Sequence, residues 1–258
     1  MSCIINFMEA YIHTYCRNNY QQIINQKIEK LKLSKLWDEL EFLFIPISSL
    51  REQDKEYFEQ LKQQDSKIII FEHQDPNFNS EPATLNFIKN RALNFESNKK
   101  ILYTHTKGTS RDNYLLRRRM MAWSRYMDLN CIYKWKECVE ALNNFDTAGG
   151  HFTGGQEEYS QQTEDQFHFV NDVGMNGKYM DRGIYMASIP HYSGNFWWAN
   201  SNHLKRLPEL NPDNLNYFNR GEFWVCYPRD TKSYNIMNPF VNHYAEYYNK
   251  DSDFPPGF

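Results

Sequence analysis

The first half of the chain alternates between short apolar runs and stretches that carry apolar residues at helical spacing. Short apolar runs are typical of buried strands, whereas apolar residues every three or four positions are typical of helices. The apolar runs predict strands at Cys3–Phe7, Glu41–Pro46, Lys67–Phe71 and Ile101–Thr104. The helical spacing predicts helices between them, at Tyr20–Leu33, Asp54–Leu61 and Glu81–Asn94.

This alternation predicts an α/β fold with a mostly parallel, twisted sheet and helices on both faces. Such sheets bind ligands at the carboxyl ends of their strands, near the point where the strand order changes direction. No glycine-rich turn follows the first predicted strand, where the chain continues Met8-Glu9-Ala10-Tyr11, and no GxxxxGK[ST] phosphate loop occurs. Both observations count against a dehydrogenase and a P-loop enzyme.

The second half of the chain has a less regular pattern. Leu115–Leu142 has the spacing of one long helix or of two helices, and Asn200–Leu207 that of a short helix ended by Pro208. The stretch Asp146–Pro190 is rich in glycine, glutamine, aspartate and asparagine, which predicts a long functional loop. Since no repeat and no convincing linker divides the sequence, we expect a single domain over residues 1–258.

Charge and cysteine content narrow the class of protein. The formal net charge of -3 counts against a protein that binds a nucleic-acid backbone. A local cluster of arginines, at Arg111, Arg117–Arg119 and Arg125, suits a compact anion such as a diphosphate. Five cysteines without CxxC spacing predict reduced, buried thiols. Without a membrane-spanning run or a secretory signal, the expected location is the cytoplasm, or the host cytoplasm if a virus encodes the protein.

The segment ILYTHTKG places polar residues directly after the Ile101–Thr104 strand. At the carboxyl end of a strand, His105 can donate a hydrogen bond to a diphosphate and Lys107 can balance its charge. A polar turn with a solvated lysine fits the same residues equally well. The candidate diphosphate-binding residues are His105, Thr106, Lys107 and Gly108, with Arg118 and Arg125 as possible helpers.

The segment HYSGNFWWANSNHLKRLP is the densest unusual stretch of the sequence. Adjacent tryptophans on a strand point to opposite faces, so one can lie in the core while the other lines a pocket. An aromatic ring stacked on a sugar, with polar side chains bonded to its hydroxyls, suits carbohydrate binding. The alternative is two core tryptophans beside a glycine turn. The candidate sugar- or acceptor-binding residues are His191, Ser193, Asn195, Trp197 and Trp198.

The segment Arg220–Trp224 sets Glu222 between an arginine and two aromatic residues. A partly desolvated glutamate can act as the general base that deprotonates an attacking hydroxyl, so Glu222 is the candidate catalytic residue. A structural ion pair between Glu222 and Arg220 is equally compatible with the sequence.

The sequence gives little indication of a metal site or of a nucleophilic catalytic triad. The one Asp-x-Asp, Asp251-Ser252-Asp253, lies in the proline-rich tail, and neither HExxH nor a GxSxG elbow occurs. A divalent ion could be held by Asp146, Glu157 or Asp172, although their spacing does not call for one. We therefore expect no required cofactor, with Mn²⁺ or Mg²⁺ possible but not favoured.

Six segments in this order resemble a family of GT-A-type glycosyltransferases. The resemblance covers roughly residues 3–228, and HTKG and SGNFWWA are its most specific motifs. The segments are SKLWD (Ser34–Asp38), EPATL (Glu81–Leu85), ILYTHTKG (Ile101–Gly108), FDTAGG (Phe145–Gly150), HYSGNFWWANSNHLKRLP (His191–Pro208) and RGEFW (Arg220–Trp224).

The resemblance implies a GT-A domain with a nucleotide-sugar-binding half (residues 1–110) and an acceptor-binding half (residues 111–258). It implies transfer of a sugar from a nucleoside-diphosphate sugar, with a UDP-sugar favoured, to a glycan or glycoprotein acceptor. Most GT-A enzymes carry a metal-binding Asp-x-Asp where this chain has His105-Thr106-Lys107, which is similar to the metal-independent branches. The layout from SGNFWWA to Glu222 is similar to that of inverting, metal-independent transferases, in which a glutamate after the acceptor-binding segment is the base.

Two other classes stay open as alternatives. A carbohydrate-binding protein that has lost transfer would keep the aromatic cleft and the donor site. A nucleotidyltransferase or phosphohydrolase would need clustered carboxylates for Mg²⁺, which the sequence does not show at a predicted strand end. The acceptor is not implied by the resemblance, because residues 154–188 form a longer stretch than in many relatives.

Overall fold

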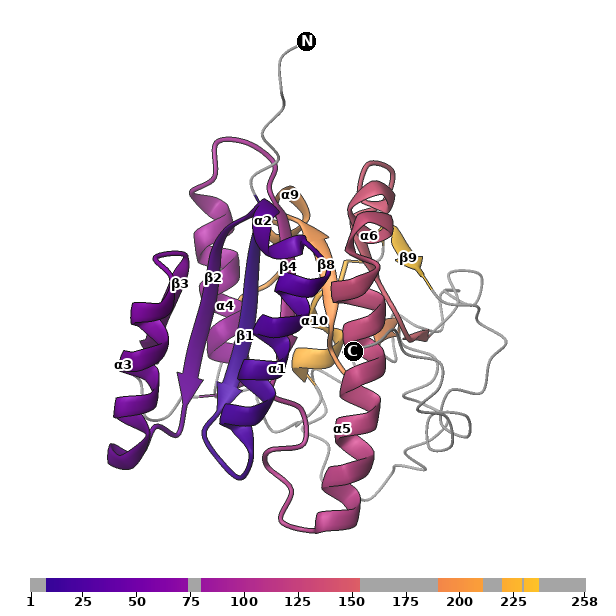
Figure 1. Ribbon diagram of the computed structural model, residues 1–258. Helices are drawn as coiled ribbons and strands as arrows, with labels where there is room; N and C mark the ends of the chain where they lie inside the picture. The colour runs from indigo at the N-terminus through magenta and orange to yellow at the C-terminus, as the bar shows by residue number, and fades with distance from the viewer. Residues whose placement is uncertain (1–7, 74–79, 154–189, 211–219, 229, 237–258) are drawn as a thin grey trace.

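The computed structural model describes residues 8–73, 80–153, 190–210, 220–228 and 230–236. Their framework is a seven-stranded sheet with the strand order β3-β2-β1-β4-β8-β5-β9 (Figure 1). The first four strands along the chain pair in parallel: β1 (Met8–Tyr15), β2 (Leu40–Ser48), β3 (Ile68–Glu72) and β4 (Lys100–His105).

The rest of the sheet is short and partly antiparallel. Strand β8 (Trp197–Asn200) is antiparallel to β4 and to β5 (Thr147–Gly149), whereas β9 (Ser233–Asn235) is parallel to β5. A separate two-stranded sheet joins β6 (Phe152–Thr153) to β7 (His191–Tyr192). The predicted loop Asp146–Pro190 therefore begins with two strands, and its residues 154–189 lie outside the described part of the chain.

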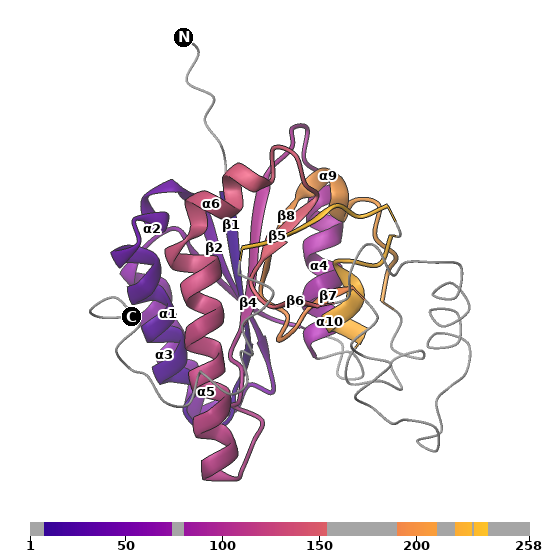
Figure 2. The same ribbon diagram turned by 90° about the vertical axis from the view of Figure 1, so that its right-hand side faces the viewer.

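Helices cover both faces of the sheet, as Figure 2 shows. One face carries α1 (Tyr20–Leu33), α3 (Lys55–Gln64), α5 (Tyr114–Asp128) and α6 (Trp135–Ala141). The other carries α4 (Glu81–Leu93), α9 (Ser201–Leu204) and α10 (Arg220–Trp224). Three short turns complete the path, namely α2 (Leu36–Glu39), the 3-10 turn η1 (Glu52–Asp54) and the π-helical turn η3 (Leu129–Tyr133). The predicted α/β fold with helices on both faces is confirmed.

The two faces of the sheet bury separate hydrophobic cores. Trp198 packs into the core beneath α1 and α6, whereas its neighbour Trp197 packs into the core beneath α4 and α10. Both indole rings are fully buried (0% exposed), and each N–H is bonded, Trp197 to Asn195 Oδ1 and Trp198 to the Cys131 carbonyl. The alternation of side chains along β8 thus sends one tryptophan to each core.

The first strand of the described chain differs from the prediction. Residues Cys3–Phe7 lie outside the described part of the chain, and Met8-Glu9-Ala10-Tyr11, expected to follow the first strand, belongs to β1 (Met8–Tyr15). The hydrophobic pattern does not predict this strand, because the polar residue Glu9 is buried within it (0% exposed) and interrupts the apolar run. Its carboxylate accepts hydrogen bonds from Arg91 at 2.6 and 2.7 Å and from the Tyr11 hydroxyl at 2.7 Å. The turn that follows β1 carries no glycine either.

The remaining elements lie close to their predicted positions. Helix α1 has the predicted bounds, because Ile23, Ile24, Ile28 and Leu31 form one buried stripe. The predicted Leu115–Leu142 segment is divided into α5, η3 and α6. The four described cysteines, Cys16, Cys131, Cys138 and Cys226, are buried free thiols, as expected.

Candidate functional site

A cavity of about 430 Å³ opens where the strand order changes direction. Strand β1 has β2 and β3 on one side and β4 on the other, which makes the β1–β4 boundary the switch point of the sheet. Ligands of open α/β sheets bind outside the carboxyl ends of the strands at this point. The cavity is lined there by His13 and Tyr15 at the end of β1 and by His105 and Thr106 at the end of β4.

Segments from both halves of the chain complete the lining. The N-terminal residues of α4, the turn Lys107–Arg111 and Met120 contribute, together with Gly194, Asn195, Gly221 and Glu222. The cavity is therefore assembled from elements that are far apart in sequence, and it brings together four charged side chains: Glu81, Lys107, Arg111 and Glu222.

The turn after β4 is held against the end of β1. Thr106 donates its N–H to the His13 carbonyl (2.9 Å), and its hydroxyl oxygen accepts the Tyr15 N–H (3.0 Å). Gly108 has a φ of +91°, and a Cβ at this position would lie 2.8 Å from the Met120 side chain. The turn needs glycine for both reasons. Thr106 and Gly108 thus shape the wall of the cavity.

Lys107 is one of the charged residues that line this cavity. Its ammonium lies 4.1 Å from the centre of the Trp123 ring, and no described residue accepts a hydrogen bond from it. Burial lowers the pKa of Lys107, with a smaller effect of Arg111 in the same direction, while attraction to Glu222 and Glu81 opposes both. Three N–H donors on a partly desolvated cation suit an anionic ligand.

His105 is a neutral imidazole with a defined tautomer. Its Nε2 lies 3.0 Å from the Gly194 carbonyl oxygen, which can only accept, so Nε2 carries the hydrogen. Burial, and then the charge of Lys107, hold the pKa of His105 well below its ordinary value of 6.5. A neutral ring has no second N–H, so the expected donation from His105 to a diphosphate has no free donor. Its Nδ1 is a hydrogen-bond acceptor instead.

Glu222 lies in the cavity on the first turn of α10. One of its carboxylate oxygens, Oε1, accepts the N–H of Gly194, and no described residue donates to the other. Gly194 has a φ of +93°, and a Cβ there would collide with the Met127 side chain. The Arg220 side chain lies outside the described part of the chain, so the alternative of an Arg220–Glu222 pair is not described.

Glu81 is a second carboxylate of the cavity, and the sequence did not single it out. Its Oε1 accepts hydrogen bonds from the Tyr103 hydroxyl (2.7 Å) and from Asn195 Nδ2 (2.8 Å). In the sequence, Glu81 has the ordinary appearance of an acidic residue in the first turn of a helix, followed by Pro82. The tertiary contacts, and not the local pattern, identify it.

His13 and His73 form a second group that the sequence did not indicate. The Thr84 hydroxyl lies 2.8 Å from His13 Nδ1 and 2.8 Å from His73 Nε2. Since a hydroxyl has one hydrogen, it donates to one ring and accepts from the other, which couples the two tautomers. Burial lowers the pKa of His13 to about 3 and lowers that of His73 as well. His13 therefore faces the cavity as a neutral ring.

Of the five predicted sugar-binding residues, Asn195 lines the cavity. His191 and Ser193 are buried outside the lining, where the His191 ring contacts Phe223 (4.7 Å between centroids) and the Ser193 N–H is bonded to the His151 carbonyl (2.9 Å). Trp197 and Trp198 lie in the two cores. The expectation that one tryptophan of the pair lines a pocket is therefore wrong for this cavity, because both indoles are needed to fill the interior.

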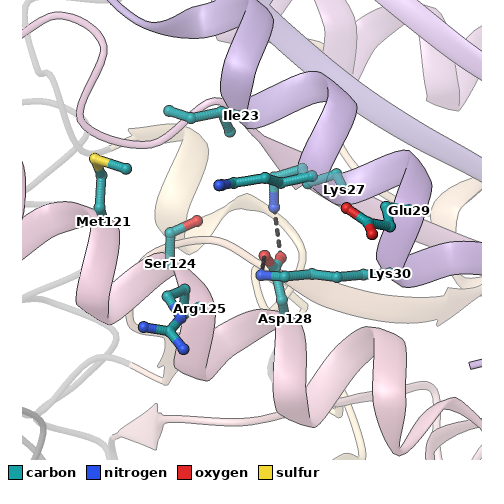
Figure 3. A pocket seen from close by; sticks show the side chains of 9 residues that line it. Ile23, Lys27, Glu29, Lys30, Met121, Ser124, Arg125 and Asp128 are labelled. Carbon is teal, nitrogen blue, oxygen red and sulfur yellow. Dashed lines mark hydrogen bonds and ion pairs between the residues drawn. The ribbon is translucent and has the colours of Figure 1, made fainter. Parts of the chain in front are cut away.

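Arg125 belongs to another cavity, of about 340 Å³, between α1 and α5 (Figure 3). There Lys27 and Lys30 from α1 each bind one oxygen of Asp128 from α5, at 2.5 and 2.8 Å. The pKa of Asp128 is lowered, because attraction to the two lysines outweighs the opposing effect of burial. Arg125 thus does not line the cavity of Lys107, where Arg111 lies instead. The side chain of Arg118 lies outside the described part of the chain.

The described ranges contain no group of three or more His, Cys, Asp or Glu side chains placed to hold a metal ion. The Asp146 carboxylate accepts the Lys232 N–H at 2.9 Å, while Glu157 and Asp172 lie outside the described residues. No helix in the described ranges is long and apolar enough to cross a membrane.

Comparisons with known proteins show a likeness in structure but none in sequence. Neither a protein-family model nor a curated protein sequence matches the chain. Among solved structures, 4-diphosphocytidyl-2C-methyl-D-erythritol synthase from Anaerococcus prevotii matches over 90% of this chain and 87% of its own, with 9% identity and a TM-score of 0.43. The strand order of the sheet itself establishes the fold class. The likeness to this enzyme does not indicate which reaction the chain catalyses.

Proposed function

We propose that the chain is a glycosyltransferase that uses a nucleoside-diphosphate sugar, with a UDP-sugar favoured, and a glycan or glycoprotein acceptor. The observation that carries the proposal is the pairing of Lys107 with Glu222 in one cavity at the switch point of the sheet. The cation suits a departing diphosphate, and the carboxylate suits a general base. The resemblance to GT-A-type transferases supports the same assignment.

The proposed reaction assigns one role to each of these side chains. The acceptor hydroxyl attacks the anomeric carbon of the donor sugar while the bond from that carbon to the diphosphate oxygen breaks. Glu222 takes the proton of the hydroxyl, and attack opposite to the leaving group inverts the anomeric centre. Lys107, helped by Arg111 in the same cavity, stabilises the negative charge that develops on the diphosphate. The proposal requires no metal ion.

The test compares donor binding with turnover in Glu222→Gln. Glutamine keeps an oxygen that can accept the Gly194 N–H, so the fold and donor site are expected to persist while the base is lost. Binding of UDP and UDP-sugars is measured by thermal shift and calorimetry, with and without Mn²⁺. Release of free sugar from UDP-glucose, UDP-galactose, UDP-N-acetylglucosamine and UDP-xylose reports turnover without an acceptor.

We expect Glu222→Gln to bind the donor like the wild type and to lose more than 99% of the release rate, about the factor of 10²–10⁴ that a general base supplies. The exposed Glu96→Gln serves as the matched control. Unchanged turnover in Glu222→Gln would remove Glu222 from the mechanism. Donor binding by the wild type without any sugar release or transfer would instead favour a non-catalytic nucleotide-sugar-binding protein.

A further inference from the structure

We propose that Glu81 and Asn195 form a subsite that binds one hydroxyl group of the donor sugar, an inference that rests on the proposed function. The two side chains come from the start of α4 and from the turn before β8, and both line the cavity of Lys107. They are hydrogen-bonded to each other at 2.8 Å, which makes them one surface.

The carboxylate of Glu81 has one oxygen occupied and one available. Oε1 accepts from both the Tyr103 hydroxyl and Asn195 Nδ2, whereas no described residue donates to Oε2. The side chain is 28% exposed although its backbone begins a helix that packs on the sheet. Glu81 therefore presents a hydrogen-bond acceptor to the cavity in a fixed position.

The amide of Asn195 is oriented by its partners. The Trp197 Nε1–H can only donate, so the atom that receives it at 2.8 Å is the amide oxygen of Asn195. The NH₂ group must then face Glu81, where one of its two hydrogens is bonded. The second hydrogen has no acceptor among the described residues, so it is a free donor beside the free oxygen of Glu81.

A free acceptor next to a free donor complements a hydroxyl group, which donates one hydrogen bond and accepts others. A sugar hydroxyl would donate to Glu81 Oε2 and accept from Asn195 Nδ2. Lys107 lines the same cavity as Glu81 and Asn195, so the subsite and the place proposed for the diphosphate lie in one cavity. The sugar attached to that diphosphate is therefore the part of the ligand that reaches the pair.

The pair is held rigidly before any ligand binds. Asn195 is 3% exposed, its N–H is bonded to the Tyr192 carbonyl at 2.8 Å, and its φ of 58° is one that asparagine tolerates better than most residues. Such preorganisation lowers the entropic cost of binding. It also makes the site selective, since a sugar that lacks the hydroxyl leaves both polar groups unpaired.

Gly221 leaves space directly in front of this pair. A Cβ at Gly221 would lie 3.7 Å from the Glu81 carboxyl carbon and 3.7 Å from Asn195 Nδ2, and the glycine lines the cavity. These are ordinary van der Waals distances, and no positive φ requires glycine here. An alanine would therefore fit the fold while its methyl group occupied space next to the pair.

The first experiment uses Glu81→Gln. The glutamine oxygen can still accept from Tyr103 and Asn195, so its NH₂ replaces the free Oε2 and turns an acceptor into a donor. Calorimetry with UDP and with the UDP-sugar that the wild type binds best then separates sugar contacts from nucleotide contacts. We expect the affinity for UDP to stay within twofold of the wild type, and that for the UDP-sugar to fall at least tenfold.

Deoxy analogues of that sugar identify the hydroxyl. For one position, replacing the hydroxyl by hydrogen is expected to weaken binding at least tenfold in the wild type and less than threefold in Glu81→Gln. This loss of sensitivity shows that the side chain and the hydroxyl act together, which a general structural defect would not produce. Gly221→Ala provides a second variant: its melting temperature should match the wild type, and its UDP-sugar affinity should fall while UDP affinity does not.

The outcomes separate the two proposals. If both variants bind the UDP-sugar as the wild type does, or if UDP and UDP-sugar weaken equally, the subsite is overturned and the glycosyltransferase proposal stands. If the wild type binds neither UDP nor any of the four UDP-sugars, both proposals are overturned. If Glu81→Gln fails to fold, the result for Gly221→Ala decides alone.

Discussion

Asp128→Asn removes the only carboxylate that contacts both buried lysines between α1 and α5 in the described structure (Figure 3). The exposed fractions of the side chains are 1% for Lys27, 7% for Lys30 and 3% for Asp128. Breaking a buried ion pair by removing one partner costs about 3–5 kcal/mol, because the remaining charge is left uncompensated. Asparagine has nearly the same shape as aspartate, so the loss of stability measures the removal of the negative charge and not the creation of a cavity.

The structure also sets an upper limit to this loss. Burial lowers the pKa of Lys27 from 10.5 to about 8 even beside Asp128. In Asp128→Asn the pKa falls further, and Lys27 can release its proton instead of remaining as a buried cation. Releasing it at pH 7 costs about 5 kcal/mol relative to an unfolded pKa of 10.5, at about 1.4 kcal/mol per pH unit, but the wild type already bears about 3 kcal/mol of this cost through its folded pKa of about 8. Because proton release limits the share of Lys27 in this way, we expect Asp128→Asn to lose about 3 kcal/mol at pH 7, the lower end of that range.

The sign of the pH dependence follows from the same protons. The unfolded chain holds the Lys27 proton between pH 7 and 8, and folded wild-type Lys27 is mostly protonated at pH 7 and about half protonated at pH 8, whereas the folded variant does not hold the proton. The variant's stability therefore rises with pH in this window more steeply than that of the wild type, and its deficit shrinks by about 1 kcal/mol from pH 7 to pH 8. Urea unfolding at pH 7 and 8, followed by tryptophan fluorescence, measures both quantities.

The exposed Asp38→Asn is the matched control and should stay within about 0.5 kcal/mol of the wild type. A loss below 1 kcal/mol for Asp128→Asn would show that water entering the adjoining cavity already solvates the lysines. A deficit that is constant between pH 7 and 8 would refute the proton release from Lys27.

Three further predictions concern the cavity of Lys107. Lys107→Met should weaken UDP binding about 10- to 150-fold, because it removes a charge-assisted hydrogen bond of about 1.5–3 kcal/mol. Uridine, which has no phosphate, should bind the variant and the wild type equally well in calorimetry. Equal effects on both ligands would contradict contact between Lys107 and the phosphates. Gly194→Ala should lower the free energy of unfolding by at least about 2 kcal/mol in urea titrations, since its φ of +93° and the Met127 side chain both oppose a Cβ. Wild-type stability should fall as the pH drops below 6.5, because the unfolded chain protonates His13 while the folded pKa is about 3. His13→Gln should reduce that slope by about 1.4 kcal/mol per pH unit, and an unchanged slope would show that His13 is not the neutral group.

The spacing of apolar residues was sufficient to predict those helices and strands that pack one apolar side against the core. Helix α1 was predicted with its observed bounds because its isoleucines and leucine repeat at helical spacing. Strand β1 escaped prediction because Glu9 and His13, which interrupt its apolar pattern, are stabilised by Arg91 and Thr84 from the distant helix α4. From the sequence alone, a polar residue is expected to be exposed. Its burial becomes evident only from the residue that forms a hydrogen bond or ion pair with it in the folded protein.

For the candidate site as well, the sequence predicted some features and only the tertiary structure decided the others. By itself, the sequence determined that a strand ends in a polar turn with Lys107 and that Glu222 and Asn195 lie in unusual segments, because strand and turn chemistry are local. Only the tertiary structure decided which side chains share a cavity. It brought Glu81 to Asn195, placed Arg111 rather than Arg125 beside Lys107, and buried both tryptophans of β8. Spatial neighbours are set by the strand order of the sheet, in which β1 lies between β2 and β4, and no local pattern encodes that order.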